Sequence, residues 1–147
     1  MLILKLIDQI PFFWQLTEEE RKILVAEEDT FFATYQPEEV LIREDDESDT
    51  SLLILMNGEV NITKNKFPDR VIATVGPGAI LGEISFLTAR PRTTNVSAKT
   101  VVIAFKLDGA TMRQMDLGLQ NKIKDQLIEV LVKRLDEMND SMLKLIR

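Results

Sequence analysis

The sequence predicts a mainly β fold, an antiparallel sandwich or barrel with helices before and after it. Between residues 30 and 107, short segments rich in β-branched and aromatic residues alternate with turn signals such as the Asn-Gly pair at 57–58. Outside this block, apolar residues recur at intervals of three and four, which is the helical period. We therefore expect one domain over the 147 residues, with helices over 1–29, the β block over 30–107 and helices over 108–147.

The N-terminal segment predicts two helices. The apolar residues of the first segment recur at a helical spacing, at Leu2, Leu6 and Ile10 and at Ile3 and Ile7, which predicts a short amphipathic helix. Thr17 is followed three residues later by Glu20, and this capping-box pattern predicts a second helix that runs to about Glu28. Three side chains of this second helix are expected to be buried: Ile23, Leu24 and Ala26.

The β block contains seven segments with the composition of strands. They lie at residues 31–36, 39–43, 51–58, 59–64, 70–76, 93–98 and 100–107. Many short strands at nearly regular spacing are typical of an antiparallel sandwich or barrel.

The C-terminal segment predicts two more helices. Asp108 is a suitable N-cap for a short helix through Met115, and Asp116 is a suitable N-cap for a long helix from about Leu117 to Leu145. Apolar residues follow one face of the long helix: Leu119, Ile123, Leu127, Val130, Leu131, Leu135, Met138, Met142 and Leu145. Such a face suits packing onto the domain or pairing with another helix.

Composition excludes several classes of function. The chain has no cysteine and no histidine, which removes thiolate chemistry, disulfides and the commonest general base and metal ligand. The net charge of −6 argues against a nucleic-acid interface. No apolar run reaches the length of a membrane span, so we expect no membrane insertion. The absence of cysteine agrees with a cytoplasmic location, which we expect. The sequence shows no paired acid and base in a catalytic motif, and we expect that the protein is not an enzyme.

The acidic run at residues 44–49 is interpreted as a solvated turn. A calcium-binding loop would need a glycine and a bidentate glutamate where Thr50 and Met56 stand. No metal is therefore expected.

Residues 76–98, GPGAILGEISFLTARPRTTNVSA, carry the pattern that bears most on function. Glycines allow a close approach of the backbone, and the segment after Glu83 can form one short helical turn whose N–H groups suit an anion. Arg92, held by the preceding proline, supplies a rigid cation. A carboxylate suits a sugar hydroxyl, so the pattern predicts a site for ribose and phosphate together.

The stretch LGEISFLTARPRTTNVSA resembles the phosphate-binding cassette of cyclic nucleotide-binding domains, with a Gly-Glu pair followed nine positions after Glu83 by Pro-Arg. The stretch SLLILMNGEVNI resembles the strand–glycine–strand segment of the same family, with Gly58 at the turn. The resemblance implies a jelly-roll-like β-roll, which is an antiparallel double-stranded β-helix, with N-terminal helices and C-terminal lid helices. It places the cassette at residues 81–94.

The resemblance also implies roles for individual residues. Gly82 would permit close backbone approach, and Glu83 would accept a hydrogen bond from the ribose 2′-hydroxyl. Ile84 and Ser85 would offer backbone N–H groups to the cyclic phosphate, with which Arg92 would pair.

Two threonines follow the arginine. Thr93 would contact the phosphate or the purine edge, and Thr94 would lie beside it. Thr93 occurs with either base in relatives, so the choice between cAMP and cGMP stays open, with cAMP favoured. The sequence departs from the family at Asp45, where a glycine is frequent; we expect this departure to alter a turn away from the ligand.

The function that the resemblance implies is regulatory binding of a cyclic nucleotide, with repositioning of the C-terminal helices as the allosteric output to signal transduction. No cofactor is expected beyond this ligand. The alternative is a ligand-free interaction or dimerisation module that acts through its C-terminal helix, and the partner is either a second copy or an effector protein. The residue that covers the purine is left open among four on the last helix: Leu127, Val130, Leu131 and Arg134.

Overall fold

The computed structural model describes residues 2–146. The chain divides into two compact units, one that reaches to Gln114 and one that begins at Met115. The first unit holds all the strands and every helix up to α5, and the second consists mainly of the long helix α6.

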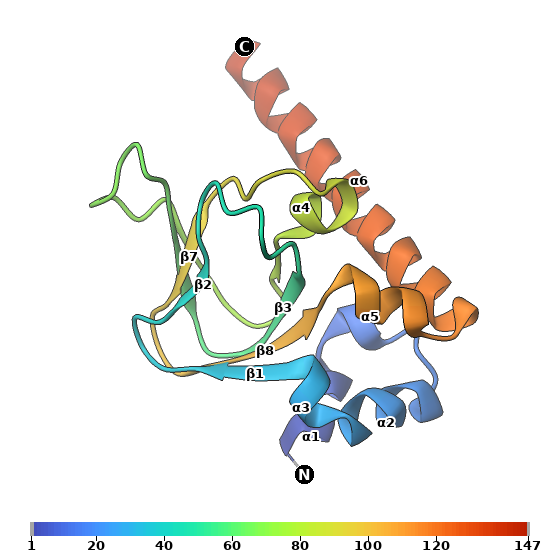
Figure 1. Ribbon diagram of the computed structural model, residues 1–147. Helices are drawn as coiled ribbons and strands as arrows, with labels where there is room; N and C mark the ends of the chain where they lie inside the picture. The colour runs from blue at the N-terminus through green and yellow to red at the C-terminus, as the bar shows by residue number, and fades with distance from the viewer. Residues whose placement is uncertain (1, 147) are drawn as a thin grey trace. The chain divides into compact units, whose positions relative to one another are not determined.

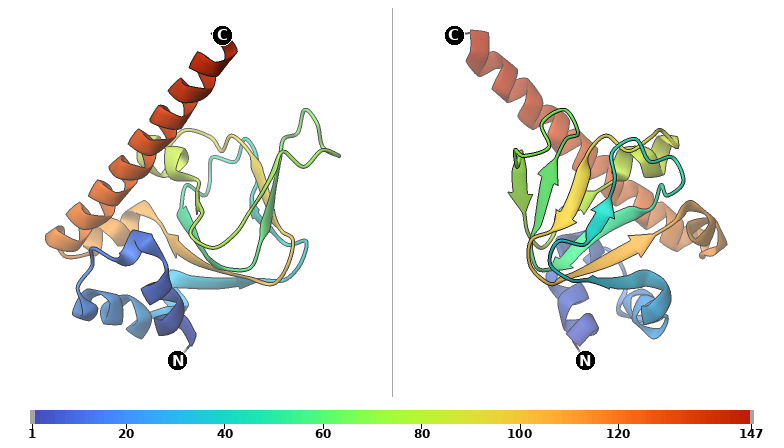
Figure 2. Two further views of the ribbon diagram at one scale, coloured as in Figure 1. Left: turned by 180° about the vertical axis from the view of Figure 1, so that it is seen from behind. Right: turned by 60° about the vertical axis from the view of Figure 1, so that its left-hand side comes forward.

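Two antiparallel four-stranded sheets form the body of the first unit (Figures 1 and 2). The first sheet has the order β1-β8-β3-β6 and the second has the order β2-β7-β4-β5. The strands of the first sheet are β1 (Phe32–Tyr35), β8 (Val102–Leu107), β3 (Leu52–Asn57) and β6 (Ile80–Leu81). Those of the second are β2 (Val40–Ile42), β7 (Asn95–Ala98), β4 (Val60–Thr63) and β5 (Ala73–Val75). The predicted fold class, a β-roll with helices before and after it, is confirmed.

Each of the seven predicted strand segments contains one observed strand. The two-residue strand β6 was not predicted, because two residues are too few to show the period-two alternation on which the prediction relies. Strand β7 has that alternation, with Val96 and Ala98 buried between half-buried neighbours.

The core fills the space between the two sheets. Side chains on alternate positions of the strands gather there, including Leu53 and Leu55 from β3 and Val102 and Ala104 from β8. Strand β3 is also buried on its other face, where α1 (Leu2–Gln9) packs against it. Because β8 follows the same alternation, Lys106 lies on the face of the strand that is turned toward the roll interior.

Aromatic rings join the N-terminal helices to the first sheet. Phe105 of β8 contacts Phe13 edge-on at 5.2 Å between ring centroids and stacks on Phe31 at 5.9 Å. Phe13 belongs to the 3-10 helix η1 (Pro11–Phe13), and Phe31 ends α3 (Glu28–Phe31). Figure 1 shows these helices beside β1 and β8.

Helix α2 (Glu18–Ala26) begins with the predicted capping box, in which Thr17 and Glu20 exchange hydrogen bonds between side chain and backbone. The prediction of its buried face was partly wrong. Leu24 is fully buried, but Ile23 is 56% exposed and Ala26 is also exposed. A helix turns by about 100° per residue, so Ile23 and Ala26 lie on other sides of this short helix than Leu24.

The two predicted C-terminal helices are present. Asp108 caps α5 (Gly109–Gln114) by accepting a hydrogen bond from the Thr111 N–H at 2.6 Å. Asp116 accepts from the Gly118 N–H at 3.0 Å at the start of α6 (Leu117–Ile146).

The apolar face of α6 changes along the helix. Leu119, Ile123 and Leu127 are buried, whereas Leu135 and the apolar residues after it are exposed. Among residues 2–146, no helix combines the length and the apolar composition that a membrane span requires.

Candidate functional site

The cassette forms a sharp corner between β6 and a short helix. Gly82 follows β6 with a left-handed φ of 74° and is the N-cap of α4 (Glu83–Thr88), which is the helical turn that the sequence predicted. A Cβ atom at Gly82 would overlap Nη1 of Arg92, so this position needs glycine for both its backbone conformation and its space. Gly82 was expected to permit a close approach of the backbone. In the structure, it is the side chain of Arg92 that comes close to Gly82.

The first turn of α4 places three backbone N–H groups at its beginning, those of Glu83, Ile84 and Ser85. The first N–H groups of any helix have no acceptor within the helix, and they make its N-terminus favourable for an anion. The side chains of Glu83 and Ser85 are buried, and that of Ile84 is 38% exposed. The structure thus brings these three predicted residues together at one helix end.

Arg92 is the buried cation of this corner. Its side chain is 2% exposed. Nη1 donates to the carbonyl oxygen of Gly82 at 3.1 Å, and Nη2 donates to the carbonyl oxygen of Ser51 at 2.7 Å. Burial lowers the pKa of the guanidinium, and nearby carboxylates, Asp49 first among them, act in the opposite direction. The side chain therefore joins the start of α4 to the loop before β3.

The backbone of Arg92 is held by the acidic turn at residues 44–49. The Asp45 N–H donates to the Arg92 carbonyl at 2.8 Å, and the Arg92 N–H donates to the Asp46 carbonyl at 3.0 Å. Asp45 has the left-handed φ of 69° that explains why glycine is frequent at this position. The expectation that this turn lies away from the site was wrong, because the turn pairs directly with Arg92.

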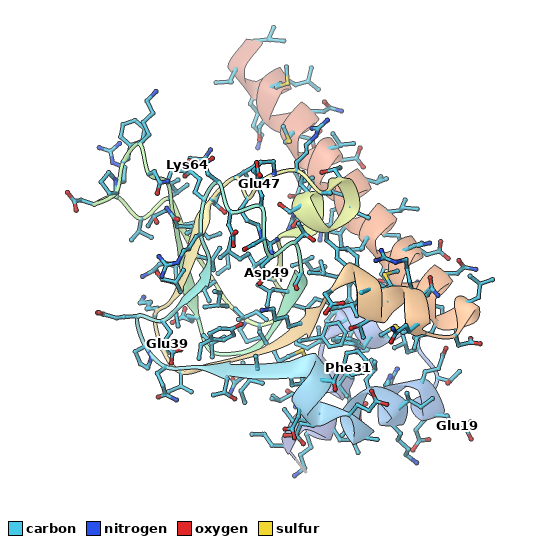
Figure 3. The ribbon with its side chains drawn as sticks, viewed as in Figure 1. Glu19, Phe31, Glu39, Glu47, Asp49 and Lys64 are labelled. Atoms are coloured by element: carbon cyan, nitrogen blue, oxygen red, sulfur yellow. The ribbon has the colours of Figure 1, made fainter. Side chains whose placement is uncertain are left out.

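Asp49 and Lys106 also belong to this corner, although the sequence did not single them out. Oδ1 of Asp49 lies 3.8 Å from Nη2 of Arg92, and Oδ2 lies 3.1 Å from Nζ of Lys106. Figure 3 shows Asp49 beside the beginning of β3. Partial burial raises the pKa of Asp49, but hydrogen bonds from Ser51 and Lys106 outweigh it and lower the pKa to about 2. No local pattern could have identified this pair, since loop and strand meet only in the folded chain.

Thr93 and Thr94 continue the chain from Arg92 into β7. Thr93 is exposed and Thr94 is half-buried. Both therefore lie next to the corner in sequence, but Arg92 is far more buried than either.

The described residues offer no site for a metal ion. Within residues 2–146, no three acidic side chains come close enough together to hold one, and the acidic run at 44–49 forms a turn instead. The charged groups of the corner are the guanidinium of Arg92, the ammonium of Lys106 and the carboxylates of Glu83 and Asp49, beside the backbone N–H groups at the start of α4. A guanidinium beside such N–H groups suits an anion, and a carboxylate suits a sugar hydroxyl.

Comparison with known families agrees with this geometry. Residues 32–116 match the model of the cyclic nucleotide-binding domain. The chain belongs to the cyclic nucleotide-binding domain family. The match covers all eight strands and α4.

Two curated relatives share part of this chain. A CRP-like cAMP-activated global transcriptional regulator of Mycobacterium tuberculosis is 31% identical over 98 residues, which are 65% of this chain and 43% of that protein. Potassium channel AKT2 of Oryza sativa subsp. japonica is 26% identical over 107 residues, which are 70% of this chain and 12% of the channel. The matched region thus spans less than half the length of either relative.

A solved structure has the same fold over nearly the whole chain. The crystal structure of a cyclic nucleotide-binding domain from Methylobacillus flagellatus has a TM-score of 0.74 and 28% sequence identity. The comparison covers 97% of this chain and 81% of that one.

Proposed function

We propose that residues 1–147 act as one regulatory module that binds a cyclic nucleotide, cAMP in preference to cGMP. The observation that carries this proposal is the burial of Arg92 at the beginning of α4. A guanidinium has five N–H donors, and its two bonds to carbonyl oxygens do not by themselves saturate it. Oδ1 of Asp49 lies 3.8 Å from Nη2 of Arg92, and the other oxygen of the same carboxylate faces Lys106. A buried cation with so loose a counter-ion is stabilised by a bound anion.

We assign the cassette residues the roles that the family resemblance implies. Arg92 pairs with the cyclic phosphate, and the N–H groups of Ile84 and Ser85 donate to the same phosphate. Glu83 accepts from the ribose 2′-hydroxyl. Gly82 leaves the space in which Arg92 lies. Burial of Glu83, Ser85 and Arg92 supports these roles, because hydrogen bonds to a ligand are stronger away from water.

The preference for cAMP is supported by the relative from Mycobacterium tuberculosis, whose name describes it as cAMP-activated. Thr93 and Thr94 lie after Arg92, where the purine edge is expected. Calorimetric titration with each nucleotide measures the preference directly. A lower Kd for cGMP than for cAMP would reverse it.

The central experiment is titration of cAMP into Arg92→Ala, with Arg90→Ala as the matched control. Arg90 is an exposed arginine two residues earlier in the same loop. Loss of the charge-assisted contact at Arg92 should weaken binding by about 1.5–3 kcal/mol, a rise in Kd of roughly 10- to 150-fold. Arg90→Ala should bind like the wild type. Absence of measurable binding of either nucleotide to the wild type would refute the proposed function.

We propose that binding is transmitted through α5 and α6, whose position changes with the ligand. A ligand shifts such an equilibrium only by its differential affinity for the two states. The chain has no cysteine, so two introduced cysteines give a unique pair of spin labels. With labels at Lys64→Cys and Lys133→Cys, the distance distribution should change when cAMP is added. The same pair on Arg92→Ala should show no change at that cAMP concentration.

A second candidate function is an interaction module that works through α6. Apolar residues lie at alternating intervals of three and four on its exposed part, as in the seam of a coiled coil: Ile128, Leu131, Leu135, Met138, Met142 and Leu145. Leu135 and Met138 are 59% and 60% exposed. This face suits a second copy of the chain or the helix of an effector protein.

Light scattering after size exclusion tests the homodimer. Leu135→Glu should shift the mass toward the monomer, and Lys133→Glu, which adds the same side chain outside the seam, should not. If the wild type is monomeric at high concentration, a second copy of the chain is excluded as the partner of α6. An effector protein is then the remaining candidate partner.

Binding without turnover and a cytoplasmic location remain predictions. Chromatography of cAMP recovered after long incubation with the protein should return the unchanged nucleotide.

A further inference from the structure

The loop between β4 and β5, residues 64–72, differs in charge from the rest of the chain. It contains three cations, Lys64, Lys66 and Arg70, and one acidic residue, Asp69, which gives it a net charge of +2. Because the whole chain carries −6, the residues outside the loop carry −8. Every residue of the loop is exposed. Figures 1 and 2 show the loop projecting away from the two sheets, and Figure 3 labels Lys64 at its beginning.

The loop has a defined conformation. It contains two consecutive turns, in which the Phe67 N–H donates to the Lys64 carbonyl at 3.0 Å and the Arg70 N–H donates to the Phe67 carbonyl at 3.1 Å. At its base, the Asn65 N–H donates to the side chain of Glu44 at 2.9 Å. The side chains of the loop are therefore presented by an ordered backbone, which reduces the entropy that is lost when they bind a partner.

Phe67 lies between two cations at the tip of the loop, residues 66–70. It is 49% exposed, and Nζ of Lys66 and Cζ of Arg70 each lie 5.8 Å from the centroid of its ring. Among residues 2–146, neither cation has a carboxylate within salt-bridge distance. Residues 66–70 also line a shallow hollow on the surface. The tip thus combines an exposed aromatic ring with two cations that no carboxylate pairs.

The charge distribution favours a short acidic segment over an extended anionic surface as the partner of this tip. A membrane or a nucleic acid carries negative charge over a large area, and the charge of −8 outside the loop would repel such a surface. A short segment contacts only the projecting tip, because exposed charges farther away than about 8 Å are largely screened at physiological ionic strength. Aromatic residues and arginine are enriched at interfaces between proteins.

We propose that the tip of this loop, residues 66–70, is a docking site for a short acidic segment of a partner protein. Arg70 pairs with one carboxylate of that segment through two parallel hydrogen bonds, and Lys66 pairs with a second carboxylate. Phe67 and Pro68 contact an apolar side chain next to these carboxylates. No residue of the cassette takes part, so docking is independent of the proposed nucleotide site.

The first test uses a fluorescein-labelled peptide of glutamate and leucine. The control is the same peptide with every glutamate replaced by glutamine. Fluorescence anisotropy should show that the acidic peptide binds the wild type and that added salt weakens this binding. The glutamine peptide should bind at least about tenfold more weakly. Equal Kd values for the two peptides, or no binding of the acidic one, would overturn the proposal.

The second test locates the binding. Lys66→Ser/Arg70→Ser removes both cations of the tip and should raise the Kd of the acidic peptide by about tenfold or more. The matched control is Arg90→Ser/Lys99→Ser, which removes the same charge at two exposed positions outside the loop. This control should bind within about twofold of the wild type. Equal losses in the two double variants would mean that only the net charge matters, and docking at the tip would be refuted.

Two single variants sharpen the assignment. Asp69→Asn removes the one carboxylate of the tip and should lower the Kd of the acidic peptide about twofold to threefold. Such a gain in affinity does not arise from a damaged fold, and an equal or higher Kd would contradict recognition by charge. Phe67→Ser should raise Kd about threefold to tenfold, because the apolar contact is lost. An unchanged Kd in Phe67→Ser would refute the aromatic part of the site.

Anionic vesicles and nucleic acid are the alternative occupants. Vesicles of phosphatidylserine and phosphatidylcholine, and a single-stranded oligonucleotide, should each bind the wild type more weakly than the acidic peptide does. If either binds more tightly and loses this binding in Lys66→Ser/Arg70→Ser, the tip recognises that surface and the proposal fails. The peptide titrations decide between these outcomes whether or not the protein binds cAMP, so this proposal and the proposed function fail separately.

Discussion

Two corners of the β-roll use glycine under the same backbone constraint but with different neighbours. Gly58, in the turn between β3 and β4, has a φ of 88°, and Gly82 has a φ of 74°. A Cβ atom at Gly58 would overlap the backbone carbonyl of Val101, whereas one at Gly82 would overlap the side chain of Arg92. The Val101 carbonyl is backbone directly before β8 and is held in place by that strand, whereas the side chain of Arg92 can move. The first glycine should therefore control stability, and the second should control both stability and the anion site.

The largest effect on stability is expected for Gly58→Ala. The left-handed conformation costs a non-glycine residue about 1–2 kcal/mol, and the overlap with the Val101 carbonyl adds to it, so the free energy of unfolding should fall by about 3 kcal/mol. Urea unfolding measures this loss. The protein that remains folded should keep its affinity for cAMP, because the turn is not part of the site.

Gly78→Ala is the matched control for this comparison. Gly78 has a φ of 93° but open space where its Cβ would lie. It should show the conformational cost without the overlap, about 1–2 kcal/mol. Equal losses at Gly58 and Gly78 would mean that the crowding at Val101 has no energetic consequence.

Gly82→Ala should lower the free energy of unfolding less than Gly58→Ala, by about 1–2 kcal/mol, because the guanidinium can shift. The shift should instead weaken cAMP binding by about tenfold or more, since Arg92 would lose its bond to the Gly82 carbonyl. Calorimetry and urea unfolding on the same sample separate the two effects. If Gly82→Ala reduces stability but binds cAMP normally, then Gly82, like Gly58, acts on stability alone.

Lowering the pH should weaken the stabilising contacts around Arg92 and leave those of the turn at Gly58 unchanged. The pKa of Asp49 is lowered to about 2 by its hydrogen bonds. A lowered pKa in the folded state means that Asp49 contributes stability above its ordinary pKa of 3.8, and that this contribution is lost as the pH falls through about 2.

The effect should be small, because the Asp49 side chain is 37% exposed and water screens its interactions. Thermal unfolding between pH 2 and 5 should show a shallower decline for Asp49→Asn than for the wild type. Identical pH profiles would show that Asp49 makes no stabilising contact as a carboxylate.

Local signals in the sequence predicted most of the secondary structure. Thr17, Asp108 and Asp116 cap helices as expected, because capping depends on residues only two or three positions apart. The side chains that face inward were harder to predict, as Ile23 shows, because a short helix with several apolar residues does not reveal which of them meets the core.

The candidate site could also be predicted only in part. Gly82, Glu83, Ile84, Ser85 and Arg92 belong to one short stretch with a recognisable spacing, and the structure brings them to one corner. Asp45 was recognised as a departure from the family pattern, but its hydrogen bond to Arg92 was not foreseen, because turn and cassette are far apart in the chain.

The sequence by itself determined where the strands and helices lie and which loop carries the glutamate and the arginine, because periodicity, caps and the cassette spacing are properties of neighbouring residues. The tertiary structure alone decided what surrounds that arginine. Ser51 lies 41 positions before Arg92 and Lys106 comes from β8, and they meet only when β3 and β8 pair in the first sheet. Burial and orientation of the cation are therefore consequences of long-range strand pairing, which no short stretch of sequence encodes.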